Sequence, residues 1–315
     1  MKNVYSKYID KLFYKNWTIG ICRADIKDII RKKSFDPDIT WLFKNSYDKY
    51  YADPFIMKPV NDKIKVLHEE FPYDTDYGVI SLVTLDKDFK QIGYKTLLDT
   101  GSHISYPFYY TENDKTYIFP EAGQSEKLSC YVFDPEAETI NFLKDIINLP
   151  LRDSTIIKKD NKYWFFGTTG FTETDYKLYV FYSNNLLGPY SEHKNNPIKV
   201  GLNGNRPAGN FIEVDGVIYR PTQNCKNMYG ESITINKITE LNEKNVSEEP
   251  YLDIVINIKN KHNFGIRTIH TINVVDNLIV VDGRKWTFSP VKVLKGHFRY
   301  KRIRAKNREN IKSGD

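Results

Sequence analysis

Short runs of apolar and polar residues alternate along most of the chain, and one arrangement of them recurs five times. Each copy consists of two strand-like segments joined by a two-residue polar turn. Asn, Asp and Gly tolerate the positive φ angles of tight turns, so these dipeptides predict β-hairpins. The five turns are Asn61-Asp62, Asn113-Asp114, Asp160-Asn161, Asp215-Gly216 and Asp276-Asn277.

The spacing of the hairpins predicts the fold class. The first residues of successive turns lie 52, 47, 55 and 61 positions apart. A multi-strand unit that recurs at roughly 40–50 residues or a little more is typical of propeller blades. The sequence therefore predicts an all-β fold, a five-bladed β-propeller. A further strand is expected after each of the first four hairpins, at Val79–Leu85, Leu128–Phe133, Leu178–Ser183 and Glu231–Ile238.

The N-terminal arm is expected to close the ring. Ile26, Ile29 and Ile30 have helical spacing, which predicts a short helix within Asp25–Lys33. Trp17–Cys22 reads as a strand. We expect it to cross back and pair near Val291–Leu294, because that pairing would remove exposed sheet edges. The resulting divisions are an arm with its closing strand, 1–50, a propeller body, 51–295, and a basic tail, 296–315.

Charge and cysteine content narrow the class of protein. The net charge is +6, and much of the excess lies between Lys292 and Lys312. This tail is either a solvated extension or a peripheral contact with anionic lipid. No nucleic-acid-binding motif accompanies it, so we expect no nucleic-acid partner. Three widely spaced cysteines and the lack of an apolar leader favour a cytoplasmic protein.

The innermost strand of a propeller blade lines the central channel, so polar residues at the strand ends should converge. Several are carboxylates, and acid–base chemistry at an anomeric carbon needs carboxyl groups held in different protonation states. The alternative is that they cap turns and pair with arginines. His270 is a candidate base, a cation ligand or a buried histidine bonded to the backbone. No sequence pattern supports zinc, and we expect no metal site. The candidate catalytic residues are Asp53, Glu121 and Asp153. The candidate substrate-binding residues are Glu70, Tyr106, Arg206, Asn210, Gln223, Tyr229, Arg267, His270 and Asp282.

Two motifs resemble the five-bladed glycoside hydrolases of the family 43 type. The resemblance implies that Asp53, in Asp53-Pro54, acts as a base, and that Asp153 opens the third blade as a second carboxylate. The segment Tyr182–Tyr190 is similar to an outer-strand turn of that group. The chain departs from the pattern at the fourth blade, where Asn205–Asn210 has no glutamate in the place of the general acid.

A longer series of motifs, from Trp17 to Gly283, resembles the N-terminal propeller domain of glucosamine inositolphosphorylceramide transferases and bacterial relatives linked with surface polysaccharides. Plant members of that family carry a separate glycosyltransferase domain, which we do not expect in this chain. The motifs include Ala52-Asp53-Pro54-Phe55, Glu69-Glu70-Phe71, Gly78-x-Ile80-Ser81, Pro120-Glu121, Arg152-Asp153-x-Thr155, Arg206-Pro207-Ala208-Gly209, Tyr219-Arg220-Pro221, His270-Thr271 and Val281-Asp282-Gly283.

Three functions stay open on these residues. The first is a glycosyltransferase in cytoplasmic polysaccharide or glycoconjugate assembly. It would need no cofactor, would use a nucleotide sugar as donor and would meet a carbohydrate or glycolipid acceptor. In it Asp53 is the base, Glu121 the acid or second carboxylate, and Asp153 the orienting group. The second is a furanosidase-like glycoside hydrolase, and the third is a non-catalytic glycan-binding propeller.

Overall fold

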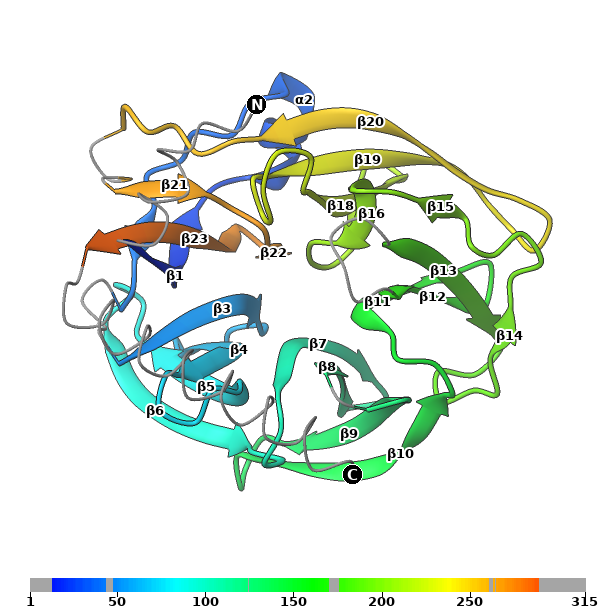
Figure 1. The fold of residues 1–315 in the computed structure, drawn as a ribbon, viewed down its shortest axis with the longest axis horizontal. Coiled ribbons are helices and arrows are strands. Elements are labelled where there is room, and N and C mark those ends of the chain that lie inside the picture. The colour runs from blue at the N-terminus through cyan, green and yellow to red at the C-terminus, as the bar shows by residue number, and fades with distance from the viewer. Residues whose placement is uncertain are drawn as a thin grey trace, which may run out of the picture.

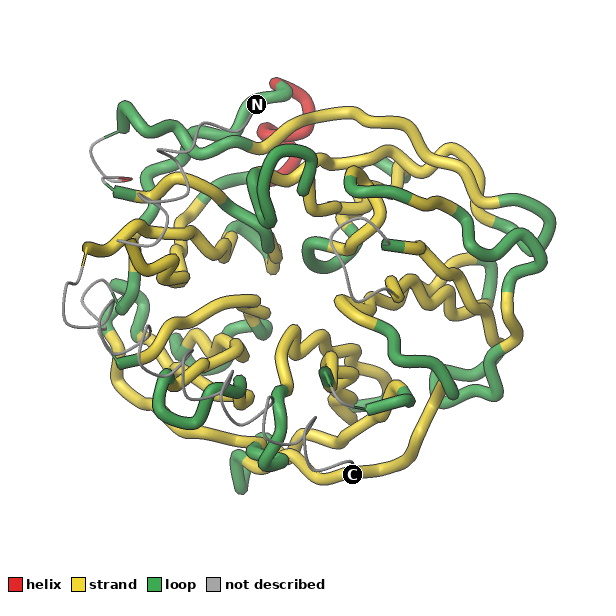
Figure 2. The backbone as a smooth tube through the Cα atoms, in the orientation of Figure 1, coloured by secondary structure: helices red, strands yellow, loops and turns green. Residues whose placement is uncertain are grey.

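Five β-sheets stand around a central axis (Figure 1). The computed structural model describes residues 13–43, 48–123, 125–169, 176–260, 263 and 265–288. Strands make up nearly all of the regular structure in this part of the chain (Figure 2). The prediction of an all-β, five-bladed propeller is confirmed.

The first four blades follow one another along the chain. The first contains β3 (Lys49–Ile56), β4 (Ile64–Pro72), β5 (Val79–Leu85) and β6 (Gln91–Leu98). The second contains β7 (Ile104–Glu112), β8 (Lys115–Ala122), β9 (Leu128–Asp134) and β10 (Thr139–Ile147). The third contains β11 (Arg152–Lys159), β12 (Lys162–Thr169), β13 (Lys177–Ser183), β14 (Ser191–Glu192) and β15 (Lys199–Val200). The fourth contains β16 (Asn203–Pro207), β17 (Ile212–Val214), β18 (Val217–Asn224), β19 (Ser232–Leu241) and β20 (Val246–Ile254).

The fifth blade joins the two ends of the chain. Its C-terminal strands are β21 (Ile266–Thr268), β22 (Ile272–Val275) and β23 (Leu278–Phe288). The arm adds β1 (Phe13–Arg23) and β2 (Thr40–Trp41). Strand β1 pairs with β23 without a break, from Phe13 opposite Phe288 to Arg23 opposite Leu278.

Closure by the arm is therefore confirmed, but the expected partner was wrong. The segment Trp17–Cys22 pairs with Ile279–Arg284, because the hairpin strand β23 is long enough to hold all of β1 on its free edge. The expected partner, Val291–Leu294, and the predicted tail, 296–315, lie outside the described residues.

The hairpin turns have the backbone conformation that their residues predict. Both turn residues have positive φ in the first four hairpins, for example 50° at Asn61 and 59° at Asp62. Such a pair of left-handed residues matches the twist of the flanking strands, so the turn fixes the register of each hairpin. In the fifth hairpin Asp276 has a φ of 55°.

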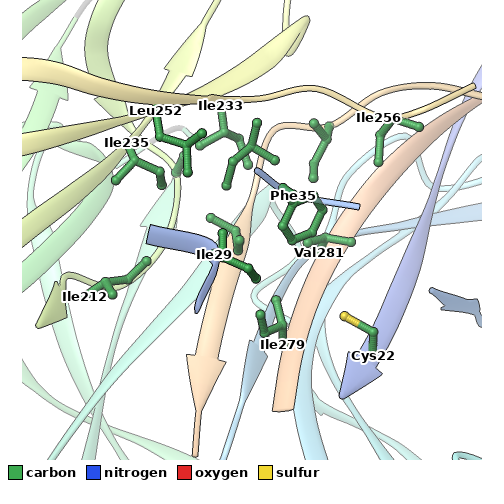
Figure 3. Packing of buried hydrophobic residues seen from close by; sticks show 14 of the residues in the cluster. Cys22, Ile29, Phe35, Ile212, Ile233, Ile235, Leu252, Ile256, Ile279 and Val281 are labelled. Atoms are coloured by element: carbon green, nitrogen blue, oxygen red, sulfur yellow. The ribbon is translucent and has the colours of Figure 1, made fainter. Parts of the chain in front are cut away.

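Apolar side chains fill the spaces between neighbouring blades. One cluster lies between the fourth and fifth blades, where the short helix α2 (Ile26–Lys32) contributes Ile29 and Ile30 (Figure 3). The Asp25 side chain accepts a hydrogen bond from the backbone of Lys27 and begins the helix. The helix lies on the outside of the ring (Figure 1), and apolar clusters of this kind fill the spaces between neighbouring blades. No helix in the described residues has the length and apolar character of a membrane span.

Candidate active site

A one-residue bulge occurs at the same place in the innermost strand of the first three blades. The register shifts fall between Ala52 and Phe55, between Ser105 and Phe108, and between Arg152 and Thr155. Each bulge contains a left-handed residue, Asp53, Tyr106 or Asp153, with φ of 50°, 47° and 48°. Bulges of this kind re-aim side chains, and strained backbone is concentrated at functional sites.

Residues of the three bulges line a cavity of about 200 Å³. Pockets for drug-sized ligands measure roughly 300–1,000 Å³, so this cavity suits a smaller molecule, about the size of one sugar ring. Four carboxylates, two arginines and two histidines contribute to its walls. The lining residues are Trp17, Tyr50, Ala52, Asp53, Glu69, His103, Ser105, Glu121, Arg152, Asp153, Arg206, Tyr229 and His270.

On one wall, Asp282 holds Asp53 and His270 in place. Its Oδ1 accepts hydrogen bonds from the backbone N–H groups of His270 and Thr271, and its Oδ2 accepts one from that of Asp53 at 3.0 Å. Oδ2 also lies 2.6 Å from Nδ1 of His270. The Thr271 hydroxyl donates to Asp53 Oδ1 at 2.9 Å, and Trp17 stacks on the His270 ring. Asp282 is fully buried, and it acts on the cavity through these neighbours.

Arg206 and Asp153 form a buried ion pair in the lining of the same cavity. The guanidinium group of Arg206 donates to Oδ2 of Asp153, and Gln223 donates to the same oxygen at 3.1 Å. The rings of Tyr176 and Tyr229 lie against the guanidinium group, about 5.1 and 5.2 Å from it. Asp153 therefore has a fixed orientation.

Glu121 and Glu69 complete the acidic lining. Glu121 lies 3.8 Å from both Arg152 and Arg206, so its charge faces two guanidinium groups. The Oε1 atom of Glu69 accepts a hydrogen bond of 3.3 Å from the hydroxyl of Tyr50.

Burial shifts the pKa values of these cavity residues. It raises the pKa of Asp53 from 3.8 to about 6, although His270 opposes the shift. It also raises the pKa of Asp153 to about 7 against the opposing effect of Arg206. The pKa of Glu69 lies well above its usual range because of burial and the neighbouring carboxylates. Burial favours neutral His270, but Asp282 and Asp53 outweigh it and raise the pKa of the imidazole. The cavity therefore combines protonated and ionised groups near neutral pH.

The side chains of Asp53, His270 and Asp282 have ligand atoms within 4.8 Å of one another, which is close enough to share a cation. Both oxygens of Asp282, however, already accept hydrogen bonds from backbone N–H groups. A protonated His270 supplies the positive charge between the two carboxylates. The donor set fits an ion-pair network better than a metal centre.

The structure brings many of the predicted residues together. Asp53, Glu121, Asp153, Arg206, Tyr229 and His270 line the cavity. Gln223 and Asp282 lie behind it and contact Asp153 and His270. Tyr106 and Asn210 lie outside the lining and take part in bonds between blades: the hydroxyl of Tyr106 accepts from the Gly209 N–H, and the Asn210 N–H donates to Asn273.

The predictions that Glu70 and Arg267 belong to the substrate-binding site were wrong. Glu70 is directed away from the cavity and accepts hydrogen bonds from Lys49, Ser81 and Tyr94. Successive side chains of a strand face opposite sides, so Glu69 lines the cavity instead. Arg267 is exposed and does not line the cavity, where Arg152 is the second arginine.

Seven residues of the lining were not among the predicted site residues: Trp17, Tyr50, Ala52, Glu69, His103, Ser105 and Arg152. Trp17 reaches the site through the pairing of β1 with β23, which depends on contacts between the two ends of the chain. Tyr50 is the second residue of β3, and His103 directly precedes β7. Their position beside a strand end, together with an aromatic ring, is the signal that would have found them.

The comparisons with known proteins agree with this architecture. The model of the family described as glucosamine inositolphosphorylceramide transferase 1, N-terminal, matches residues 44–283. A protein of that name from Oryza sativa subsp. japonica is 31% identical over 208 residues, which cover 64% of this chain and 28% of the relative. The namesake from Arabidopsis thaliana is 29% identical over 285 residues, which cover 81% of this chain and 36% of the relative. The chain thus spans about a third of the length of these relatives.

Solved structures share the fold at low sequence identity. A family 117 glycoside hydrolase from Zobellia galactanivorans superposes with a TM-score of 0.52 at 13% identity, over 89% of this chain and 92% of the other. An exo-β-1,3-galactanase from Phanerochaete chrysosporium gives a TM-score of 0.50 at 9% identity, over 65% of this chain and 49% of the other. The family match covers most of the propeller, and the chain belongs to the family of glucosamine inositolphosphorylceramide transferase 1 N-terminal domains.

Proposed function

We propose that this propeller is a carbohydrate-active enzyme that transfers a glycosyl residue during glycoconjugate assembly. The observation that carries the proposal is the cavity of about 200 Å³ with four carboxylates in its walls, Asp53, Glu69, Glu121 and Asp153. Substitution at an anomeric carbon needs one carboxyl group to accept a proton and another to stabilise or protonate the departing group. The size of the cavity suits a single sugar ring.

Asp53 is the proposed base. It lies in the cavity wall, and a pKa of about 6 leaves it mostly ionised at neutral pH and close to the operating range. Thr271 and the backbone bond to Asp282 fix its carboxylate. In the reaction it takes the proton of the attacking hydroxyl as that oxygen bonds to the anomeric carbon.

Asp153 and Arg206 are the proposed sugar-orienting pair. Their ion pair is held by Gln223, and Tyr229 covers the guanidinium group. A carboxylate in a fixed position can accept hydrogen bonds from sugar hydroxyls without losing orientation. The names of the relatives combine a glucosamine transferase with a ceramide lipid, and they support a glycolipid or another glycoconjugate as the acceptor.

Glycoside hydrolysis is the second candidate, and the charge of the cavity favours it. Four carboxylates face two arginines and His270. The diphosphate of a nucleotide sugar would add negative charge to this lining, whereas a neutral sugar would not. With water in place of the acceptor hydroxyl, the same groups would cleave a glycoside.

Binding and turnover of Asp53→Asn test the proposal. Thermal-shift measurements with free sugars, alkyl glycosides and nucleotide sugars would identify a ligand, and turnover would then be followed with and without an added acceptor sugar. We expect Asp53→Asn to keep binding and lose about 10²–10⁴-fold in rate, as for the loss of a general base. Asp62→Asn, in the exposed hairpin turn of the same blade, is the matched control.

Each outcome decides between the candidates. Product that contains the acceptor sugar supports transfer, and free sugar alone supports hydrolysis. Binding without turnover would leave a glycan-binding propeller. Full activity in Asp53→Asn would remove this residue from the reaction, and the absence of a shift with every sugar would overturn the assignment of the cavity.

A further inference from the structure

Glu69 differs from the other carboxylates of the cavity in its surroundings. Asp53 faces His270, Asp153 is paired with Arg206, and Glu121 lies near two arginines. Among the described residues, the one basic side chain within ion-pair distance of Glu69 is His103, with Nδ1 3.8 Å from Oε1. The charge state of His103 therefore decides whether Glu69 has a cationic partner.

His103 is neutral in this environment. Its Nδ1 accepts a hydrogen bond of 2.9 Å from the backbone N–H of Gly78, so that nitrogen has no proton to donate. Burial and the nearby Arg152 lower the pKa of the imidazole. The 3.8 Å approach of His103 to Glu69 is therefore not an ion pair, and the Tyr50 hydroxyl is the donor to this carboxyl group.

The backbone makes room for the Glu69 carboxyl group. A Cβ atom added to Gly78 would lie 2.6 Å from Glu69 Oε1 and 2.8 Å from the carbonyl oxygen of Ile104. Position 78 therefore requires glycine, because a side chain there would collide with the Glu69 carboxyl group. The carboxyl group reaches the cavity while the residue is only 4% exposed.

A buried carboxyl group without a cation is favoured in its neutral form. Burial, Asp53 and Glu121 together raise the pKa of Glu69 well above its usual range. Burial without a cationic partner therefore favours the protonated form of Glu69, whereas Asp53 lies beside His270. The first blade thus places a candidate acid, Glu69, on β4 and the proposed base, Asp53, on the neighbouring strand β3.

We propose that Glu69 is the proton donor to the leaving oxygen of a bound glycoside, an inference that rests on the proposed function. As the bond between the anomeric carbon and the leaving oxygen breaks, its electron pair stays on that oxygen, which takes the proton of Glu69. The acceptor hydroxyl, or water, bonds to the anomeric carbon and gives its proton to Asp53. Solvent then takes the proton from Asp53 and restores that of Glu69.

This assignment narrows the class of donor substrate. An alcohol or sugar is a poor leaving group and needs a proton, whereas a nucleoside diphosphate departs as a stable anion. Glu69 therefore indicates a glycoside as donor. It also supplies an acid, which the start of the fourth blade lacks, because Asn205–Asn210 contains no glutamate.

Infrared spectroscopy tests the protonation of Glu69 without a substrate. At pH 8, the spectrum of the wild-type protein minus that of Glu69→Gln should contain the carbonyl stretch of a protonated carboxyl group. Asp53 and Asp153 are mostly ionised at this pH, with pKa values of about 6 and 7. The exposed Glu240, whose pKa its amide neighbours lower, is the control, and Glu240→Gln should remove carboxylate bands alone. Carboxylate bands in the Glu69→Gln difference would overturn the proposal.

Leaving-group dependence tests the catalytic role. Glu69→Gln should slow alkyl glycosides by about 10²–10⁴-fold and spare dinitrophenyl glycosides, because dinitrophenolate departs without a proton. Glu121→Gln should slow both classes to a similar extent. The reverse pattern would transfer the role to Glu121. If no glycoside reacts, the role of Glu69 as proton donor fails, and turnover of a nucleotide sugar would still support the proposed function.

Discussion

Two buried groups of charges in this propeller behave in opposite ways. In the fourth blade, Glu248 accepts two hydrogen bonds from Arg220, at 2.6 and 2.7 Å, and a third from Lys199. Arg220 also donates to the carbonyl groups of Gly204 and Asn205. Burial alone would raise the pKa of Glu248, but its cationic partners outweigh burial and lower it.

In the cavity, nearby basic side chains do not offset the effect of burial on the pKa values of the carboxyl groups. Burial raises the pKa of Asp53, Asp153 and Glu69, even where a cation lies nearby. A carboxylate of this kind destabilises the fold when it ionises, whereas Glu248 contributes to stability in its ionised form. The difference indicates that the fourth-blade cluster holds the fold together, whereas the cavity carboxylates lower its stability, as expected if the cavity has the proposed catalytic function.

The largest expected effect is the loss of Arg220. Arg220→Met would leave Glu248 buried with Lys199 as its remaining partner, and breaking a buried pair in this way costs about 3–5 kcal/mol. Denaturant unfolding measures the change. The double variant Arg220→Met, Glu248→Leu should recover much of the loss, because no uncompensated charge remains. Equal losses in the single and double variants would contradict the role of the ion pair.

Arg206→Met should have a smaller effect, about 2–3 kcal/mol, although Arg206 is also buried and paired. Asp153 can take up a proton, since its pKa is already about 7. Its pKa would rise further without Arg206, so the loss should be small at pH 5 and should grow as the pH increases through neutrality. Urea unfolding at several pH values measures this. A loss of unfolding free energy that does not change with pH would show that Asp153, like Glu248, stays ionised in the folded protein.

The sequence predicted the blades because their determinants are local. The alternation of the strands and the left-handed Asn and Asp residues at the turns lie within each repeat. The same repeats placed Asp53 and Asp153 at corresponding strand ends, where the bulges direct them into the channel.

The details that the sequence did not reveal depend on non-local register. Glu69 and Glu70 are neighbours, and pairing with β3 and β5 decides which of them faces the axis. Trp17 enters the site through the pairing of two segments near opposite ends of the chain. Arg267 is exposed and lies at a register shift of β21, between Ile266 and Thr268, which the sequence pattern does not reveal.

The pH dependence of stability in Asp53→Asn tests most directly whether the cavity is kept at a cost to the fold. The unfolded pKa of Asp53 is near 3.8 and its folded pKa is about 6, so the wild-type protein loses stability as the pH rises through this window. The shift, which already includes the opposing attraction to His270, corresponds to about 3 kcal/mol. We expect the stability of Asp53→Asn relative to the wild-type protein to rise by about 2 kcal/mol from pH 4 to pH 8. A variant that loses stability relative to the wild-type protein over that range would show that Asp53 is a structural carboxylate like Glu248, and would contradict the account.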